Sequence, residues 1–247
     1  MDLNYETYSK ASTVAHYSRE TELQGCEAYV FSKYIVDGAH ILDVGVGGGR
    51  TTFHLARRAG RYLGVDYVDS MVEQCRNRFN DVEFRRLDAS DLQGLESNTF
   101  DVVVFSFNGI DTLAPDERRV ASLREFRRVL RGGGKLIFSS HNARQFLVMP
   151  LLANTDLPHK VWRTIRAVYK SGQLAARMLP SSAFLRGAGY IKDPVHGGLI
   201  NHAATQEHVT DETIKEGFRL LEVVNGHYPK APPFFATPWY YYVFERR

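Results

Sequence analysis

The stretch that decides the fold is Ile41-Leu42-Asp43-Val44-Gly45-Val46-Gly47-Gly48-Gly49-Arg50-Thr51-Thr52. An apolar strand here runs into a glycine-rich turn and then into a helix, which is the context in which a glycine motif binds a ligand. Glycine permits positive φ and a close ligand approach, and the free amides at a helix start favour a negatively charged group. The stretch therefore predicts a loop that binds a ligand carrying a carboxylate or a phosphate.

The spacing of the glycines narrows the class of ligand. A dinucleotide fingerprint requires a third glycine where this chain has Arg50, and no Gly-Lys-Ser/Thr follows to make a P-loop. Asp66 follows the apolar run Tyr62–Val65, where a carboxylate can accept hydrogen bonds from two ribose hydroxyls. Asp88 ends the next apolar run, so a third strand also finishes in an acid. Together these features favour a ligand that contains adenosine.

Short apolar runs alternate with segments of helical period between residues 39 and 139. The runs are Ala39–Val44, Tyr62–Val65, Val82–Leu87, Phe100–Phe105 and Lys135–Ser139. Helices are predicted from Asp69 or Ser70 to Phe79 and from Pro115 to Leu130, where Gly132–Gly134 stop the second helix. Alternating strands and helices predict βαβ units with right-handed crossovers. We therefore expect an α/β chain with a Rossmann-like, doubly wound, mostly parallel sheet.

Two flanks surround this alternation. Residues 1–38 have a helical pattern, and residues 142–190 contain an amphipathic stripe around Trp162 that predicts a helical lid. A helix that merely covers one sheet edge is the alternative for this insertion. Further along, we expect a strand over Gly197–Ala204, a helix over Thr205–Gly217 and strands over Arg219–Val224 and Tyr240–Glu245. The sheet should therefore end in antiparallel members.

The composition is that of an ordinary globular chain. Its 247 residues are 44% apolar, with 31 Lys and Arg against 28 Asp and Glu, a formal charge of +3. A chain of this mass buries roughly 73% of its extended surface, which is enough for a hydrophobic core without disulfide bonds or structural metal ions. Cys26 and Cys75 lack zinc or redox spacing. With no signal-like start and no apolar run long enough to span a bilayer, we expect a reduced, cytoplasmic protein without membrane contact.

Four motifs, in order, resemble those of the class I S-adenosylmethionine-dependent methyltransferases. They are Asp43–Gly49, Gly64–Asp66, Leu87–Ala89 and Leu130–Leu136. The likeness covers about residues 38–141 and continues more weakly through Thr210–Val224. It implies one methyltransferase domain over residues 1–247, with an N-terminal helical cover (1–38), a cofactor-binding core (39–141), the lid insertion (142–190) and a C-terminal sheet completion (191–247).

The same resemblance implies S-adenosylmethionine as the cofactor and assigns its contacts. The glycine loop, with Gly45 and Gly47, would lie under the methionine part, Asp66 would hold the ribose, and Phe105 or Ser106 would line the methionine side. In the alternative interpretation, the glycines only make a tight turn and the acids only cap helices.

The adenine end is assigned by the resemblance in the same way. Tyr67 and Met71 would flank the adenine ring, and Asp88 would accept a hydrogen bond from its amino group beside the Ala89 amide.

Histidines near strand ends are the candidates for proton transfer. If the acceptor is a hydroxyl, a histidine of near-neutral pKa is the usual base. His141 ends the fifth strand on the same edge as the ligand acids, and His196 and His202 are the next candidates. A satisfied structural hydrogen-bond donor is the alternative role for each. Asn108 could orient a polar group of the substrate or simply close a turn.

Two departures from family motifs narrow the acceptor. Methyltransferases that act on base amines often carry Asp/Asn-Pro-Pro-aromatic after the fourth strand, and this chain has Ser106-Phe107-Asn108-Gly109. Metal-dependent members gather acids and an Asn at this edge, but Asn108 and Asp111 alone form no evident set of ligands. We therefore expect no required metal and disfavour a nucleic-acid acceptor.

Basic and aromatic clusters admit two interpretations. One basic cluster lies on a single helix (Arg118, Arg119, Arg124, Arg127, Arg128 and Arg131), and the other spans Lys160–Lys170. Either could follow an RNA backbone or hold an anionic acceptor, but we favour solvated helix faces. The aromatics Phe234, Phe235, Trp239 and Tyr240–Tyr242 could line a pocket or pack in the core.

The sequence thus predicts a methyltransferase that methylates a small molecule or a sugar, most simply on oxygen. An RNA methyltransferase and a non-catalytic regulatory protein that binds S-adenosylmethionine are the alternatives. The sequence leaves open the acceptor, the choice between oxygen and nitrogen, and the oligomeric state.

Overall fold

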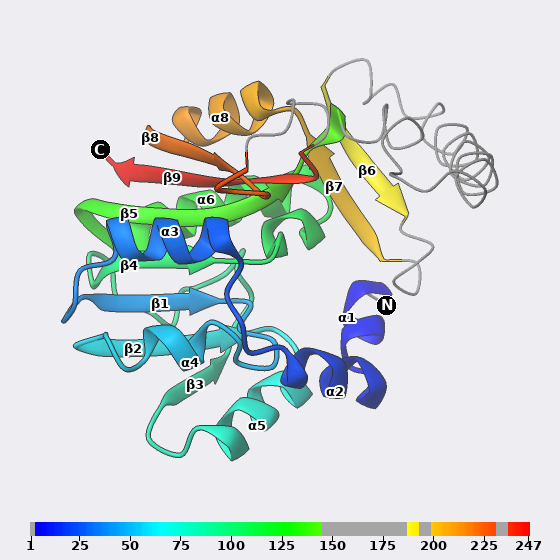
Figure 1. Cartoon of the computed structure of the whole chain (residues 1–247), viewed down its shortest axis with the longest axis vertical. Coiled ribbons are helices and arrows are strands. Elements are labelled where there is room, and N and C mark those ends of the chain that lie inside the picture. Colours follow the sequence, from blue (N-terminus) through cyan, green and yellow to red (C-terminus); the bar gives the residue numbers. More distant parts are fainter. Residues whose placement is uncertain (1–2, 145–186, 193–198, 231–236) are drawn as a thin grey trace.

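A computed structural model describes residues 3–144, 187–192, 199–230 and 237–247 of the chain. Its main sheet has the strand order β3 (Glu83–Arg86), β2 (Arg61–Asp66), β1 (His40–Val44), β4 (Phe100–Phe105), β5 (Leu130–His141), β9 (Trp239–Arg246), β8 (Phe218–Asn225). The first five strands of this order run parallel, whereas β9 is antiparallel to both β5 and β8 (Figure 1). The predicted Rossmann-like, mostly parallel sheet with an antiparallel C-terminal strand is confirmed, and β9 is that strand, since β8 runs parallel to β5.

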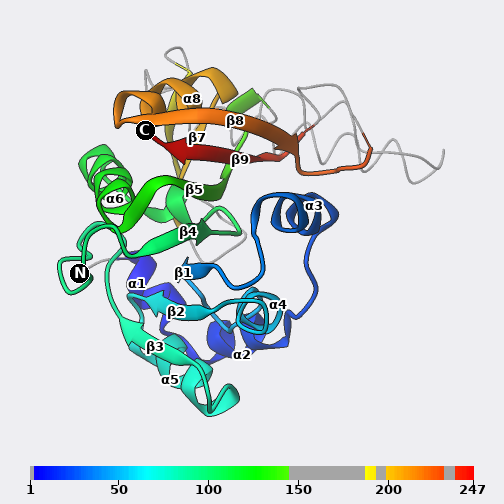
Figure 2. The ribbon, with the colours of Figure 1, turned by 90° about the vertical axis from the view of Figure 1, so that its left-hand side faces the viewer.

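Helices cover both faces of this sheet, because its strands are apolar on both sides. One buried cluster joins the sheet to α6 (Asp116–Val129) and α8 (Gln206–Lys215). The other joins it to α3 (Gly25–Tyr34), α4 (Thr52–Leu55) and α5 (Asp69–Arg78). Figure 2 shows these two layers on either side of the strands. Parallel strands buried on both faces explain why the sequence has continuous apolar runs rather than alternation.

The register of the parallel strands brings their carboxyl ends to one edge. Val44 pairs with Val65, and Asp66 pairs with Arg86, so β1, β2 and β3 end side by side. The glycine loop, Asp66 and the residues after β3 must therefore lie near one another. Ligands of open α/β sheets bind at this edge.

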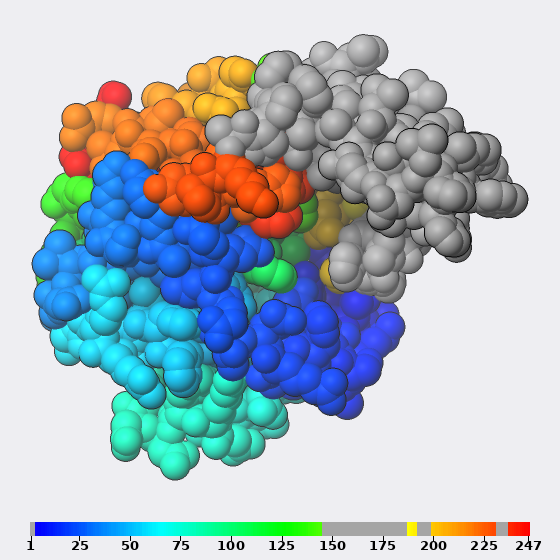
Figure 3. Space-filling view, viewed as in Figure 1, coloured from blue at the N-terminus to red at the C-terminus, as the bar shows by residue number. Residues whose placement is uncertain are grey.

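Two N-terminal helices, α1 (Leu3–Tyr8) and α2 (Ala11–Arg19), lie at that same edge (Figures 1 and 3). Asn4 anchors α1, since its side-chain amide donates to the carbonyls of Thr112 and Ile200 at 2.9 Å and accepts from the Ile200 amide. A Cβ on Gly48 would lie 2.4 Å from the backbone of Tyr17 and Ser18. The absence of a side chain at Gly48 thus lets α2 pack directly on the glycine loop.

One local prediction was right in part and two were wrong. The strand expected over Gly197–Ala204 is present as β7 (Ile200–Ala204), but it pairs with β6 (Ala188–Lys192) in a separate two-stranded sheet and not in the main sheet, where β9 occupies the edge of β5. The end of the expected helical lid, Ala188–Tyr190, is part of strand β6. Gly132–Gly134 lie within β5, in an irregular register with β4, rather than between helix and strand.

Several predicted features lie outside the described residues. They are most of the lid insertion with its basic stretch Lys160–Lys170, and also His196, Phe234 and Phe235. Among the residues that the structure describes, no helix combines the length and the apolar character needed to cross a bilayer. Both cysteines are buried free thiols.

Candidate active site

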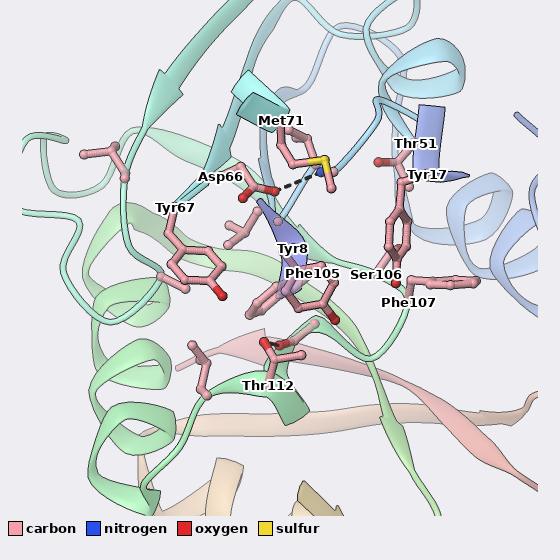
Figure 4. Close-up of a pocket in the computed structure, with 18 of the residues that line it drawn as sticks. Tyr8, Tyr17, Thr51, Asp66, Tyr67, Met71, Phe105, Ser106, Phe107 and Thr112 are labelled. Carbon is pink, nitrogen blue, oxygen red and sulfur yellow. Dashed lines mark hydrogen bonds between the residues drawn. The ribbon is translucent and has the colours of Figure 1, made fainter. Parts of the chain in front are cut away.

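A pocket with an empty volume of about 980 Å³, open mouth included, lies at the carboxyl edge of the sheet (Figure 4). Its walls include the eight residues that the sequence proposed for the cofactor, namely Gly45, Gly47, Asp66, Tyr67, Met71, Asp88, Ala89 and Ser106. The strand ends thus bring all eight together around one cavity.

The glycine loop forms one wall of the pocket. Its backbone has positive φ angles, which residues other than glycine rarely adopt. Gly45, Gly47 and Gly49 have φ of +63°, +53° and +84°. A Cβ at Gly45 would also come within 2.7 Å of the Phe105 ring. The loop can make this turn only with glycine at these positions.

Asp66 is buried beside this loop and is already bound to the backbone. Its carboxylate accepts hydrogen bonds from the amides of Gly47 and Val68, each at 2.9 Å. Burial nevertheless raises the pKa of Asp66 to about 6, because these bonds only partly offset the desolvation of its charge. Each carboxylate oxygen has a second lone pair, so the group can still accept hydrogen bonds from a ligand.

Asp88 lies at the opposite end of the pocket in an ion pair. Arg118 donates to it at 2.5 Å, and Ser90 donates through its amide and its hydroxyl at 2.9 and 2.6 Å. Burial alone would raise the pKa of Asp88, but these hydrogen bonds and the Arg118 charge hold it below its ordinary value. Asp88 is therefore an ionised hydrogen-bond acceptor in the wall of the pocket, paired with Arg118, and Met71 and Ala89 line the same pocket.

Two tyrosines from the N-terminal helices also line the pocket, and the sequence did not assign them to it. Tyr8 and Tyr17 lie with ring centroids 5.9 Å apart, and Tyr17 meets Phe107 edge-on at 6.4 Å. Burial raises the pKa of Tyr8 well above its ordinary value, so its phenol stays neutral. No local motif identifies these tyrosines, since their role depends on how α1 and α2 pack across the sheet edge.

The residues after β4 hold a strained turn at the pocket mouth. Phe107 and Asn108 both have left-handed backbones, with φ of +56° and +58°. Such conformations are costly for residues other than glycine and cluster at functional sites. The Phe107 ring is 46% exposed and contacts the Arg50 guanidinium, 4.9 Å from its centroid. The turn thus presents an aromatic face toward the pocket opening.

His141, the predicted base, does not line the pocket and instead lies behind this turn. Its Nδ1 is 2.8 Å from Asp111, and its Nε2 is 3.2 Å from the Asn108 amide. The side chain is 30% exposed. His202 is 2% exposed and lies 3.8 Å from the other oxygen of Asp111.

The basic helix α6 and its flank form ion pairs with carboxylates of the same chain. Five of its six arginines do so, and their partners are Asp88, Asp111, Glu212, Glu216, Glu125 and Asp101. This pairing argues against a nucleic-acid surface. The predicted solvated face was wrong for Arg119, whose side chain has zero exposure because it is paired in the interior. Within the described part of the chain, no cluster of three histidine, cysteine or acidic side chains could bind a metal ion.

Comparisons with known proteins agree with this geometry. Residues 41–134 match the model of a family described as "Methyltransferase domain". The arsenite methyltransferase of Aquipseudomonas alcaligenes is 37% identical over 119 residues, covering 42% of this chain and 33% of that protein. The cypemycin N-terminal methyltransferase of a Streptomyces species is 31% identical over 122 residues, covering 49% and 50%. The chain thus spans half or less of these relatives' length.

A solved structure extends the likeness of the fold to the whole chain. The CcbJ methyltransferase from Streptomyces caelestis superposes with a TM-score of 0.66 at 17% identity, covering 100% of this chain and 99% of that one. At this identity the match concerns the fold alone. Residues 41–134 thus match a methyltransferase domain, and the whole chain shares the fold of a solved methyltransferase.

Proposed function

We propose that this protein transfers a methyl group from S-adenosylmethionine to an oxygen of a small-molecule or sugar acceptor. The observation that carries the proposal is the single pocket that brings together the glycine loop, Asp66 and Asp88 at the carboxyl ends of β1, β2 and β3. This arrangement offers a backbone turn and two separated carboxylates to one elongated ligand.

The residues of the pocket fit S-adenosylmethionine from end to end. Asp66 would accept from the ribose hydroxyls, and Asp88 and the Ala89 amide would face the adenine edge, with Tyr67 and Met71 beside the ring. Gly45, Gly47 and Ser106 would lie along the methionine part. When bound, the sulfonium supplies the reactive methyl carbon and a neutral leaving group.

The chain's own residues would then position the acceptor and exclude water. Tyr8, Tyr17 and Phe107 form an aromatic wall beside the methionine end, which suits an apolar or ring-bearing acceptor. Holding a hydroxyl in line with the methyl carbon lowers the activation free energy by several kcal/mol. His141 would take the hydroxyl proton. We also propose residues 1–38 as the cover of this site and residues 39–141 as its cofactor-binding core.

Nitrogen methylation is a second candidate, because one relative's name specifies an N-terminal methyltransferase. A non-catalytic protein that binds S-adenosylmethionine is a third. Incubation of the purified protein with methyl-labelled S-adenosylmethionine and a metabolite extract separates the three. We expect the label in a small molecule as a methyl ether, identified by mass spectrometry and NMR of the labelled product. A label on nitrogen would favour the second candidate, and cofactor binding without any transfer would contradict an enzyme.

Asp66→Ala should weaken the binding of S-adenosylhomocysteine by more than tenfold. The variant loses hydrogen bonds between the ribose and a charged acceptor, each worth about 1.5–3 kcal/mol. Isothermal titration calorimetry measures the change in Kd, and circular dichroism checks that the variant folds. Asp69→Ala is the matched control, since this nearby acid is half-exposed and pairs with Arg86 outside the pocket. Equal affinities for Asp66→Ala and the wild type would contradict the ribose assignment.

The affinity for S-adenosylhomocysteine should also rise with pH between pH 5 and pH 7. Burial raises the pKa of Asp66 to about 6, so most of this carboxyl is protonated at pH 5 and ionised at pH 7. Because the ionised form accepts hydrogen bonds more strongly, the affinity should be up to about tenfold lower at pH 5. The same titration on Asp66→Asn should show little pH dependence. Any that remains would report Asp43, whose burial also raises its pKa to about 6.

A further inference from the structure

A buried cluster of charged and polar groups lies behind the pocket, around Asp111. The side chains of Asp111 and Arg119 have zero exposure, and Arg119 donates to Asp111 at 3.3 Å and to Glu212 at 2.7 Å. Ser140 donates its hydroxyl to Asp111 at 2.7 Å. The cluster connects the 3₁₀ helix η1 (Gly109–Thr112) to α6, β5 and α8. Burying a charged side chain costs free energy unless ion pairs and hydrogen bonds replace its hydration. The contacts of Asp111 therefore indicate its role.

The second oxygen of Asp111 is bound to His141 twice. It accepts from the backbone amide of His141 at 2.7 Å and lies 2.8 Å from Nδ1 of the same residue. Burial alone would raise the pKa of Asp111, but the hydrogen bonds from His141, the nearby His202 ring and the Arg119 charge together hold it well below the ordinary value. Asp111 is therefore an ionised carboxylate, which can only accept hydrogen bonds. The Nδ1 atom of His141 must carry a proton to make this contact.

That contact determines the state of the other ring nitrogen. In neutral His141 with a proton on Nδ1, the Nε2 atom has a free lone pair, and the Asn108 amide is 3.2 Å away in position to donate to it. Asn108 lies between Phe107 and Gly109, which both line the pocket. The Nε2 lone pair thus faces the strained turn at the pocket mouth, where an acceptor hydroxyl could replace the Asn108 amide.

We propose that Asp111 is a positioning residue that fixes His141 in the Nδ1–H tautomer, with Nε2 directed to the acceptor and Asn108 as its resting partner. This inference rests on the proposed methyl transfer to oxygen. In the step, the acceptor O–H bond breaks and its proton goes to Nε2, while the oxygen bonds the methyl carbon. The bond from that carbon to sulfur breaks, and its electron pair leaves with the sulfur. The imidazolium then releases the proton to water.

The alternative is that Asp111 only joins η1 to β5 and to the buried Arg119. The two roles differ in whether Asp111 determines which ring nitrogen of His141 carries the proton. ¹⁵N NMR of histidine-labelled protein without cofactor or acceptor should show His141 protonated on Nδ1 and unprotonated on Nε2. A wild-type spectrum with the proton on Nε2 would overturn the proposal, whether or not any variant folds and whether or not an acceptor is known.

Asp111→Asn provides the second measurement. We expect a mixture of His141 tautomers, a kcat at least tenfold lower in label transfer, an altered pH profile of kcat, and an unchanged Kd for S-adenosylhomocysteine. Ser140→Ala is the matched control, because it removes another hydrogen bond of Asp111 without touching the imidazole. The proposal is contradicted if the pH profile and the tautomer stay unchanged in Asp111→Asn. A correct tautomer with no transfer to any oxygen would count against the proposed function instead.

Discussion

His141→Gln should lower kcat for transfer to an oxygen acceptor by about 10²–10⁴-fold, which is the usual contribution of a positioned general base. The glutamine keeps a polar side chain of similar reach but cannot take the acceptor proton at neutral pH. His141 does not line the pocket that would hold the cofactor, so the Kd of S-adenosylhomocysteine should stay unchanged. Single-turnover label transfer measures the first quantity, and calorimetry measures the second.

The control for this experiment is His227→Gln, which changes an exposed histidine whose ring lies 6.1 Å from Trp239 in the loop after β8. Its kcat should equal that of the wild type. A kcat for His141→Gln within threefold of the wild type would remove the base from the mechanism.

The sequence was most informative where one local pattern determines the structure. The run into Gly45 needs positive φ at fixed positions, and the acids Asp66 and Asp88 end strands that the parallel register brings to one edge. The strands, their mostly parallel arrangement and the walls of the pocket therefore follow from motifs and from the handedness of βαβ units. The bounds of the elements follow less directly from the sequence. Gly132–Gly134 were predicted to separate a helix from the next strand, but they lie within β5.

Features that depend on contacts between distant segments could not be predicted. Tyr8 and Tyr17 reach the pocket only because Gly48 lets α2 approach the loop and Asn4 anchors α1 to Thr112 and Ile200. In the sequence, Asp111 was considered only as a metal ligand beside Asn108. Its partners come from residues 119, 140, 141 and 202, and no spacing within one segment reveals such a cluster.

Glu27→Ala should destabilise the protein by about 3–5 kcal/mol, because it leaves a buried positive charge without its partner. Glu27 has zero exposure and accepts two hydrogen bonds from Arg50, at 2.5 and 2.8 Å, and one from the Tyr241 hydroxyl at 2.9 Å. Arg50 is 8% exposed and cannot recover its hydration without moving. For a chain of this size the loss corresponds to a fall of roughly 6–20 °C in Tm.

Asp37→Ala is the matched control, because it breaks the ion pair with Arg58 at the surface, where the Asp37 side chain is 77% exposed. Such pairs contribute about 0–1 kcal/mol, so Tm should change little. A double variant, Glu27→Leu with Arg50→Met, tests the reason for the loss. If the uncompensated charge is the cause, this double variant should be more stable than Glu27→Ala alone, whereas a greater loss would show that packing at these positions dominates.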